Sequence, residues 1–237
     1  MSTDWSPPPA EPAPPPGEVA VFLARLDPGP LRLRELGALL SPREEHRAGS
    51  FAHDNWRDRW VSARGMLREI VGRAQGLAPR EVAFRYGAHG KPSADGLRFN
   101  VSHSGDYALY AVSRDVEVGV DVELPRGRRT DALARRFFAP GEQERLFALE
   151  EPARSEAFFE LWTCKEAFLK ATGEGLSRSL RSYEIDPAQG RVLWARDEDA
   201  ARWSVHPLHP PAPYRAALVA EGKPPVRTYL WPRESAS

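Results

Sequence analysis

We expect an α+β fold, because the sequence combines long helical patterns, a central run of strand patterns and a C-terminal stretch of short strand-like segments. The helical signal is strongest over residues 56–76 and 152–173. In the first of these, apolar residues recur at spacings of three and four, the period of one helix face: Trp56, Trp60, Ala63, Leu67, Ile70 and Ala74. The strand signal is strongest over residues 97–123.

Start and stop signals place the other elements of the first half. A short strand is expected over residues 19–26. Ser41 followed by Pro42 predicts a helix start, with the proline at the first helical position, and Gly76 ends the longer helix that follows. Two strand patterns, 97–101 and 107–113, flank a Ser-Gly-Asp turn and predict a hairpin.

The second half begins with an alternating strand over residues 116–123. Its four valines point to one face, and Glu117, Gly119, Asp121 and Glu123 point to the other. Three helices are then expected, capped by Thr130 or opened by Pro140 and Pro152. The last strand-like runs, separated by Pro and Gly, predict a small antiparallel sheet: 191–195, 202–208, 214–220 and 226–231.

Composition limits the classes of function. Lys plus Arg (33) balances Asp plus Glu (33), so the chain as a whole has no general attraction to nucleic acid or anionic membranes, and we expect neither as a partner. The single cysteine, Cys164, excludes an internal disulfide and a Cys-rich zinc site, and a cytoplasmic location is expected. No stretch approaches the roughly 20 consecutive apolar residues needed to span a bilayer.

Three parts are expected along the chain. Residues 1–17 carry seven prolines and predict a disordered or polyproline-like tail, residues 18–114 form an N-terminal half, and residues 115–237 form a C-terminal half. A weak similarity between residues 99–109 and 203–218 hints that the two halves are alike, although alternating hairpins also resemble one another by chance.

The pair Asp121 and Glu123 is the first candidate site. Carboxylates at i and i+2 on a strand project from one face at about 7 Å, close enough to ligate one divalent cation. Gly119 on the same face is expected to leave room for a ligand. The alternative is a half-buried strand with an ordinary polar solvent face, which a bare Asp-x-Glu pattern favours.

The second candidate lies in the helix that contains Lys165, Glu166 and Lys170. Lys165 is unusual because it falls within the broad apolar stripe of this helix. Glu166 and Lys170, at i and i+4, could supply a third metal carboxylate and a cation for a phosphoryl oxygen. Spacing alone favours a surface ion pair between them.

The third candidate runs from Lys91, in a Gly/Pro-bounded loop, to Ser102 and His103 at the end of a strand. These side chains offer hydrogen-bond donors suited to phosphate, although a turn with hydroxyls bonded to its own backbone would look the same. Adjacent Ser102 and His103 point to opposite faces of a strand, so they do not form a nucleophile and base pair.

Taken together, these segments resemble the Sfp-type 4′-phosphopantetheinyl transferase family. The resemblance rests on segments that occur in the family's order and at its spacing: Gly90-Lys91-Pro92, Asn100-Val101-Ser102-His103-Ser104, Gly119-Val120-Asp121-Val122-Glu123 and Trp162-x-x-Lys165-Glu166-Ala167-x-x-Lys170. Less distinctive similarity extends from about residue 41 to residue 180. Each segment is unspecific alone, but the joint match is highly specific.

The resemblance implies a monomer of two similar α+β halves related by pseudo-two-fold symmetry, joined near Arg114 and Asp115, with the active site in the cleft between them. It implies that coenzyme A is the substrate and that a carrier protein, acyl or peptidyl, accepts its phosphopantetheine arm. By the same resemblance, Mg²⁺ is held by Asp121, Glu123 and Glu166. Coenzyme A is contacted by Arg47, Arg59, Lys91, Ser102, His103 and Lys170.

Composition alone does not single out Arg47 and Arg59, because most arginines in such helices are solvated. Some family members have a second basic residue three positions before Arg47, where this chain has Glu44. Recognition of the 3′-phosphate is therefore expected to use other cations.

The implied reaction explains these residue types. A carrier serine attacks a doubly charged pyrophosphate and expels 3′,5′-ADP, so negative charge must be neutralised by Mg²⁺ and by Lys170. Glu166 is a candidate base for the serine, as a hypothesis, since a metal ligand loses basicity. A Mg²⁺-dependent hydrolase of coenzyme A or of a nucleotide pyrophosphate would need the same groups. A non-catalytic coenzyme-A-binding module would not need the full set of carboxylates.

Overall fold

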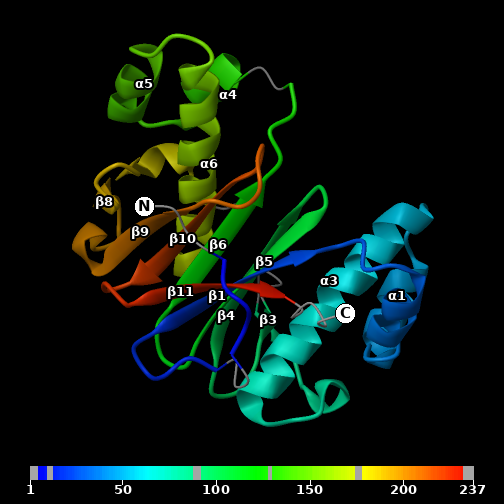
Figure 1. The fold of residues 1–237 in the computed structure, drawn as a ribbon. Coiled ribbons are helices and arrows are strands. Elements are labelled where there is room, and N and C mark those ends of the chain that lie inside the picture. The colour runs from blue at the N-terminus through cyan, green and yellow to red at the C-terminus, as the bar shows by residue number, and fades with distance from the viewer. Residues whose placement is uncertain (1–4, 10–12, 88–91, 128–129, 174–177, 232–237) are drawn as a thin grey trace.

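The computed structural model describes residues 5–9, 13–87, 92–127, 130–173 and 178–231. Among these residues, two main sheets form the centre of the molecule (Figure 1). The first has the strand order β11-β1-β5-β4, with bounds β1 Val19–Arg25, β4 Arg98–Ser104, β5 Tyr107–Ser113 and β11 Val226–Trp231. The second has the order β6-β10-β9-β8-β7, with bounds β6 Val118–Glu123, β7 Tyr183–Asp186, β8 Arg191–Ala195, β9 Trp203–Leu208 and β10 Arg215–Glu221. The predicted α+β class is confirmed.

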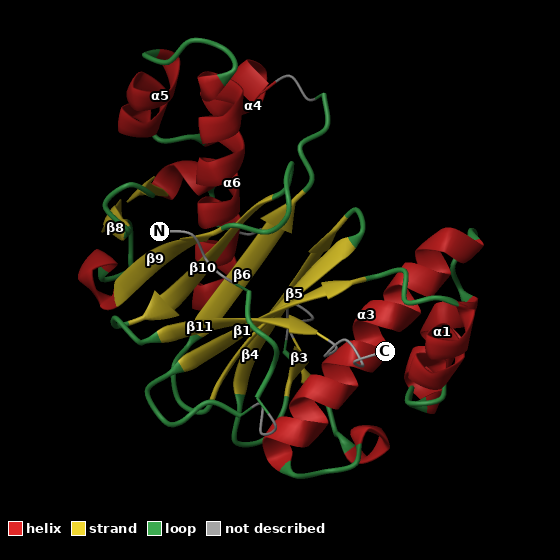
Figure 2. Cartoon of the chain, in the orientation of Figure 1, coloured by secondary structure: helices red, strands yellow, loops and turns green. Residues whose placement is uncertain are grey.

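Helices cover the outer face of each sheet (Figure 2). α3 Asp54–Gln75 covers the first sheet, and α1 Pro30–Gly37 and α2 Pro42–Gly49 pack against α3. α6 Ala153–Thr172 covers the second sheet, and α4 Thr130–Phe137 and α5 Pro140–Phe147 pack against α6. A short hairpin, β2 Arg85–Tyr86 and β3 Pro92–Ser93, precedes β4.

Alternation along the strands produces three apolar layers. Side chains such as Phe22 on β1 pack against α3, whereas those such as Val219 on β10 pack against α6. The opposite faces of both sheets meet in a shared core that includes Val118, Val120 and Val122. Because these valines face the other sheet, the predicted two-faced strand is confirmed, and its polar face is left toward α6.

Helix boundaries follow the sequence signals closely. Ser41 caps α2 in a capping box, in which the Glu44 carboxylate accepts hydrogen bonds from the Ser41 backbone N–H at 2.8 Å. Gly76 and Gly173 end α3 and α6 in the left-handed conformation, with φ of 70° and 76°. The residues that begin and end these helices were therefore predictable.

One part of the expected C-terminal sheet is wrong. β11 does not join the antiparallel strands β8, β9 and β10; it pairs in parallel with β1, with Val226 opposite Val19 and Trp231 opposite Ala24. Trp231 packs in the apolar core beneath α3. The chain thus returns at its C-terminal end to the sheet where it began, which residue periodicity alone does not reveal.

The described part of the proline-rich segment lies against this strand. The Ser6 backbone N–H donates to the Thr228 carbonyl oxygen at 3.1 Å, and the Leu230 N–H donates to the Ser6 carbonyl oxygen at 2.8 Å. The Trp5 indole N–H donates to the His209 carbonyl oxygen at 2.8 Å. The boundaries of the three parts, and a symmetry between the halves, stay predictions.

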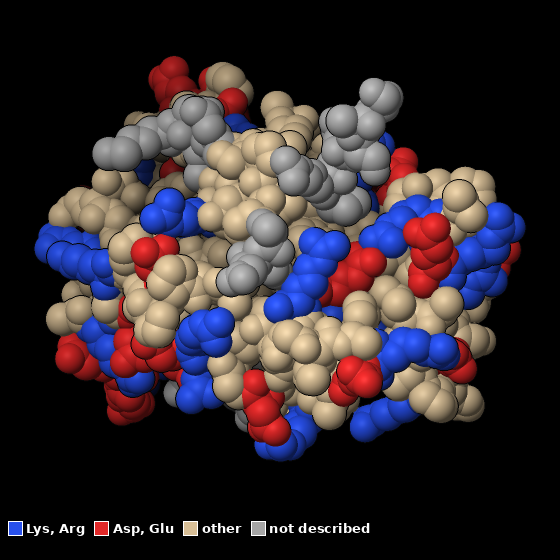
Figure 3. Space-filling model, turned by 60° about the horizontal axis from the view of Figure 1, so that its bottom comes forward, with Lys and Arg blue, Asp and Glu red and all other residues tan. Residues whose placement is uncertain are grey.

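The described helices include none that is both long and apolar enough to cross a membrane. On the face shown in Figure 3, basic and acidic side chains are interspersed over the surface. This agrees with the balance of charge along the chain.

Candidate active site

The two sheets meet edge to edge along β4 and β6, and side chains replace the usual backbone ladder there. The Asn100 Oδ1 atom accepts from the Val120 N–H at 3.0 Å, and Ser102 Oγ accepts from the Val122 N–H at 3.4 Å. Ser104 Oγ continues the series by accepting from the N–H of Leu124 at 3.1 Å. Alternate residues of β4 thereby satisfy the edge of β6 and fix the two halves in register.

Asp121, Lys170 and Ser102 meet at the centre of this seam. Lys170 Nζ donates to Asp121 Oδ1 at 2.7 Å, to Ser102 Oγ at 2.8 Å and to the Val120 carbonyl oxygen at 3.2 Å. Ser102 Oγ itself lies 2.7 Å from Asp121 Oδ1, to which it donates. Asp121 is 5% exposed, and its second oxygen, Oδ2, is buried without a hydrogen-bond partner among the described residues. A buried carboxylate oxygen without a hydrogen-bond partner is suited to bind a cation.

Glu123 and Glu166 complete a group of three carboxylates. Glu123 Oε2 accepts from Ser104 Oγ at 3.1 Å, and Glu166 lies on α6, which packs against the polar face of β6. Burial raises the pKa of Glu166, and the negative charges of Asp121 and Glu123 raise it further, while Lys170 opposes the rise. The three carboxylates therefore share one electrostatic environment.

The three carboxylates do not converge on a common site in the structure. Over the described ranges, no three His, Cys, Asp or Glu side chains are grouped closely enough to hold a metal ion. His206 and His209 are described residues and belong to no such group, and Ser204 Oγ lies 2.9 Å from His206 Nε2.

A pocket of about 300 Å³ opens beside the seam in the N-terminal half. It is lined by Leu26, Phe51, Trp56, Arg59, Trp60, His103 and Gly105. Arg59 forms an ion pair with Asp106, and the Arg47 guanidinium lies 5.0 Å from the centre of the Phe51 ring. Desolvation lowers the pKa of His103, and the positive charge of Lys170 lowers it further. The pocket thus combines aromatic walls with one lining arginine, Arg59, while Arg47 lies against the Phe51 ring.

Sequence reasoning missed the aromatic walls of this pocket. The spacing of Trp56 and Trp60 assigned both to the buried stripe of α3, but Trp56 is 60% exposed and both line the pocket. Phe51, whose ring centre lies 5.9 Å from that of Trp60, belongs to the same wall. A usable signal was the crowding of Phe51, Trp56 and Trp60 around the start of α3.

Of the other predicted residues, Lys91 lies outside the described residues. Glu44 faces inward from α2: it forms ion pairs with Arg64 and with Arg68, whose Nε lies 2.6 Å from Glu44 Oε2. The position where some resembling proteins carry a cation is therefore used here to attach α2 to α3. That phosphate recognition uses other cations stays a prediction.

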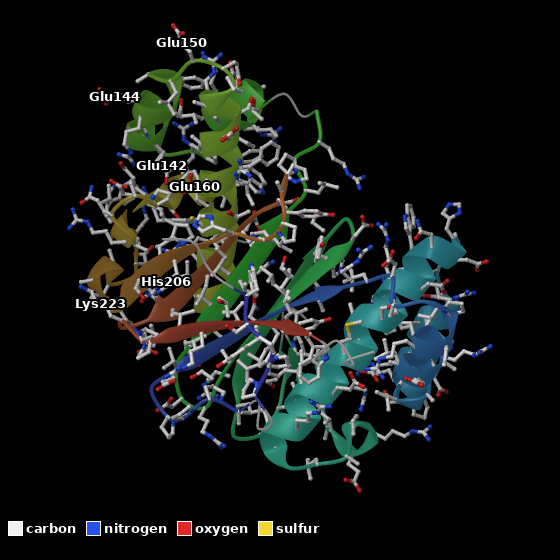
Figure 4. All side chains as sticks on the ribbon, viewed as in Figure 1. Glu142, Glu144, Glu150, Glu160, His206 and Lys223 are labelled. Atoms are coloured by element: carbon white, nitrogen blue, oxygen red, sulfur yellow. The ribbon has the colours of Figure 1, made fainter. Side chains whose placement is uncertain are left out.

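Lys165, the unusual lysine of the apolar stripe, is fully buried. Its Nζ donates to both oxygens of Glu142 at 2.7 Å and to the Tyr183 carbonyl oxygen at 3.0 Å. Glu142 lies on α5 (labelled in Figure 4), and its carboxylate extends to Lys165 on α6. Burial lowers the pKa of Lys165 to about 8 and raises that of Glu142. The adjacent Cys164 is buried, as expected, and burial raises its pKa.

The expectation for Gly119 is wrong in its physical reason. A Cβ atom at this position would lie 2.9 Å from the Ala171 Cα atom and still closer to the Ala167 carbonyl oxygen. The glycine leaves room for the backbone of α6, not for a ligand.

Known proteins resemble this chain over most of its length. Residues 117–219 match the family described as the 4′-phosphopantetheinyl transferase superfamily, and residues 26–115 match the N-terminal region of 4′-phosphopantetheinyl transferase. The chain is 38% identical to the 4′-phosphopantetheinyl transferase HetI of Nostoc sp., over 86% of this chain and 88% of that protein. It is 38% identical to a putative 4′-phosphopantetheinyl transferase of Synechocystis sp., over 70% of each chain, and 28% identical to Sfp of Bacillus subtilis, over 62% of this chain and 66% of that protein.

Proposed function

The chain belongs to the 4′-phosphopantetheinyl transferase superfamily, and from this premise we propose how its residues transfer the phosphopantetheine arm of coenzyme A to a carrier-protein serine. The observation that carries the proposal is the contact of Lys170 with Asp121 and Ser102 at the seam, beside Glu166. Cations and carboxylates meet there at the junction of the two halves, next to an aromatic pocket.

Asp121, Glu123 and Glu166 would hold Mg²⁺. Two observations support this fit: Asp121 Oδ2 is buried without a partner among the described residues, and mutual repulsion of the carboxylates contributes to the raised pKa of Glu166. A hard divalent cation prefers oxygen ligands and would relieve both. When bound, Mg²⁺ neutralises charge on the pyrophosphate and acts as a Lewis acid.

The residues of the chain orient the nucleotide. Arg59 and His103 line the pocket and would contact phosphate groups, with Arg47 behind Phe51 as a further cation. The aromatic rings of the pocket offer faces on which a base or ribose can pack. We propose that Lys91 also contacts phosphate, because the Gly90-Lys91-Pro92 segment resembles the family.

Lys170 and Ser102 then act at the reacting phosphate. Three acceptors hold the Lys170 ammonium in place, and its positive charge would stabilise the charge that develops on the leaving 3′,5′-ADP. Ser102 Oγ accepts from Lys170 and donates to Asp121, so it fixes both groups beside the reacting phosphate.

Glu166 is the proposed base for the carrier serine, directly or through water. Its raised pKa makes it a better proton acceptor than an ordinary exposed glutamate. Coordination to Mg²⁺ would oppose this role, so the two functions of Glu166 must be separated by experiment. Normal turnover by Glu166→Gln with Mg²⁺ bound would exclude it as the base.

β4 and β6 join the two halves directly, through the hydrogen bonds of Asn100, Ser102 and Ser104. We propose a cytoplasmic monomer that modifies acyl or peptidyl carriers of fatty-acid, polyketide or nonribosomal-peptide synthesis, without nucleic acid or membrane partners.

Intact-mass analysis of an apo carrier protein, incubated with the enzyme, coenzyme A and Mg²⁺, tests the proposal. We expect a gain of one phosphopantetheine that Asp121→Ala abolishes. Consumption of coenzyme A without any gain on several carriers would favour the alternative, a Mg²⁺-dependent coenzyme A or nucleotide pyrophosphate hydrolase.

A further inference from the structure

Asp106 is fixed through all three of its polar groups at the turn between β4 and β5. Its backbone N–H donates to Tyr214 Oη at 2.9 Å, and its carbonyl oxygen accepts from the Leu26 N–H at 2.8 Å. Its carboxylate forms the ion pair with Arg59. Leu26, Arg59 and the preceding Gly105 all line the aromatic pocket. One residue therefore holds a large part of the pocket wall.

The group that holds Asp106 comes from the other half of the molecule. Tyr214 directly precedes β10 in the second sheet, is 6% exposed, and packs edge-on against Tyr107 with ring centres 5.0 Å apart. Gly105 lies against the same phenol: it has φ of 57°, and a Cβ atom there would collide with Tyr214 Oη and lie 2.9 Å from Leu124 Cδ2. The turn thus fits closely onto a tyrosine of the C-terminal half.

We propose that Tyr214 is a positioning residue for coenzyme A binding: through the Asp106 backbone it sets the positions of Leu26, Arg59 and Gly105. This inference rests on the proposed function, in which the pocket binds coenzyme A. It adds that a pocket built within the N-terminal half is shaped by a contact from the C-terminal half.

Loss of the Tyr214 hydroxyl would affect the turn at Asp106 and not the carboxylates of the seam. Tyr214→Phe keeps the ring that packs on Tyr107 but leaves the Asp106 N–H without its acceptor, so the turn is free to shift. Arg59 shifts with it because its carboxylate partner is part of the turn. The carboxylates of the seam are held separately, by Ser102 and Ser104 on β4.

The test compares Tyr214→Phe with Tyr110→Phe. Tyr110 is a matched control, because its buried hydroxyl also makes a single bond to a backbone group, the Ala63 carbonyl oxygen at 2.9 Å, and it does not line the pocket. Calorimetric titration of the Mg²⁺-loaded proteins with coenzyme A should show about a 3- to 10-fold weaker Kd for Tyr214→Phe, as expected for one hydrogen bond. In the transfer assay the change should fall on KM for coenzyme A rather than on kcat.

The same measurements can overturn the proposed role of Tyr214. An unchanged Kd for folded Tyr214→Phe overturns the inference, and so does an equal loss of affinity in Tyr110→Phe, which would indicate a general effect of stability. Arg59→Met should weaken binding, and adding Tyr214→Phe to it should weaken it less than additively. If Arg59→Met leaves the Kd of the wild type unchanged, the pocket is not the coenzyme A site, and the proposed residue roles fail independently of Tyr214.

Discussion

Gly119 on β6 lies in direct backbone contact with Ala171 on α6. A methyl group at position 119 would lie 2.9 Å from the Ala171 Cα atom, and the Ala167 carbonyl oxygen would be nearer still. Both neighbours are backbone atoms of a helix, which cannot move aside as a flexible side chain could. This close approach is what allows Lys170, on the same helix, to reach Asp121 two residues along β6.

Gly119→Ala is expected to push α6 away from β6. Overpacking of this kind costs about 1–3 kcal/mol of unfolding free energy, and the displaced Lys170 should lower transfer activity beyond what the loss of stability explains. Urea denaturation and the transfer assay measure the two effects. Gly49→Ala is the matched control, since a Cβ atom there meets nothing within 4 Å. Equal behaviour of the two variants would show that α6 has room to spare.

Lys170→Met tests the cation at the seam. Because the ammonium is fixed toward Asp121 and Ser102, its loss should reduce kcat by about 10²- to 10³-fold, the range found when one preorganised charge-stabilising donor is removed. Lys223→Met is the control: Lys223 is an exposed lysine after β10, distant from the seam (Figure 4). A kcat within a few-fold of the wild type for Lys170→Met would remove this residue from the chemistry.

The buried pair of Lys165 and Glu142 should behave as a structural unit. Lys165→Met leaves the Glu142 carboxylate buried without its cation, which costs about 3–5 kcal/mol in comparable pairs. Adding Glu142→Gln should recover part of this loss. The amide oxygen can still accept from the Ala139 or Ile185 N–H groups, which the carboxylate now satisfies at 2.8 Å.

Chemical denaturation of the two single variants and the double variant gives the coupling energy directly. A double variant no more stable than Lys165→Met would mean that the network depends on the ammonium for its shape rather than for charge balance.

Much of the fold could be predicted because its signals are local. Proline and serine at helix starts, glycine at helix ends and the alternation of β6 each depend on a few neighbouring residues. The pairing of β11 with β1 could not be predicted in this way, since it joins residues about 200 positions apart and both strands carry ordinary strand patterns.

The candidate site could likewise be predicted only in part. Spacing places Asp121 and Glu123 on one face of β6 but favours an ordinary polar face over a site. It also favours an ion pair within α6 for Lys170, which instead extends across the seam to β6 and β4. The role of Tyr214 had no local signal, because its partner is the backbone N–H of Asp106, which every non-proline residue possesses.

Glu166→Gln should stabilise the metal-free protein at neutral pH. Burial and the charges of Asp121 and Glu123 raise the pKa of Glu166 in the folded state above its ordinary value of 4.5. In the window between 4.5 and the folded-state pKa the native protein therefore binds more protons than the unfolded chain, so the contribution of Glu166 to stability is lost as pH rises through that window.

Above the window the ionised carboxylate is unfavourable, and a neutral amide of the same shape removes the repulsion. Thermal unfolding in EDTA should thus give a higher Tm for Glu166→Gln at pH 7 and above, with the difference vanishing below about pH 4.5, where both side chains are neutral. Added Mg²⁺ should stabilise the wild type more than the variant, because only the wild type offers three carboxylates. A variant less stable than the wild type at pH 7 in EDTA would show that Glu166 is held by favourable contacts rather than kept, at a cost in stability, for the reaction.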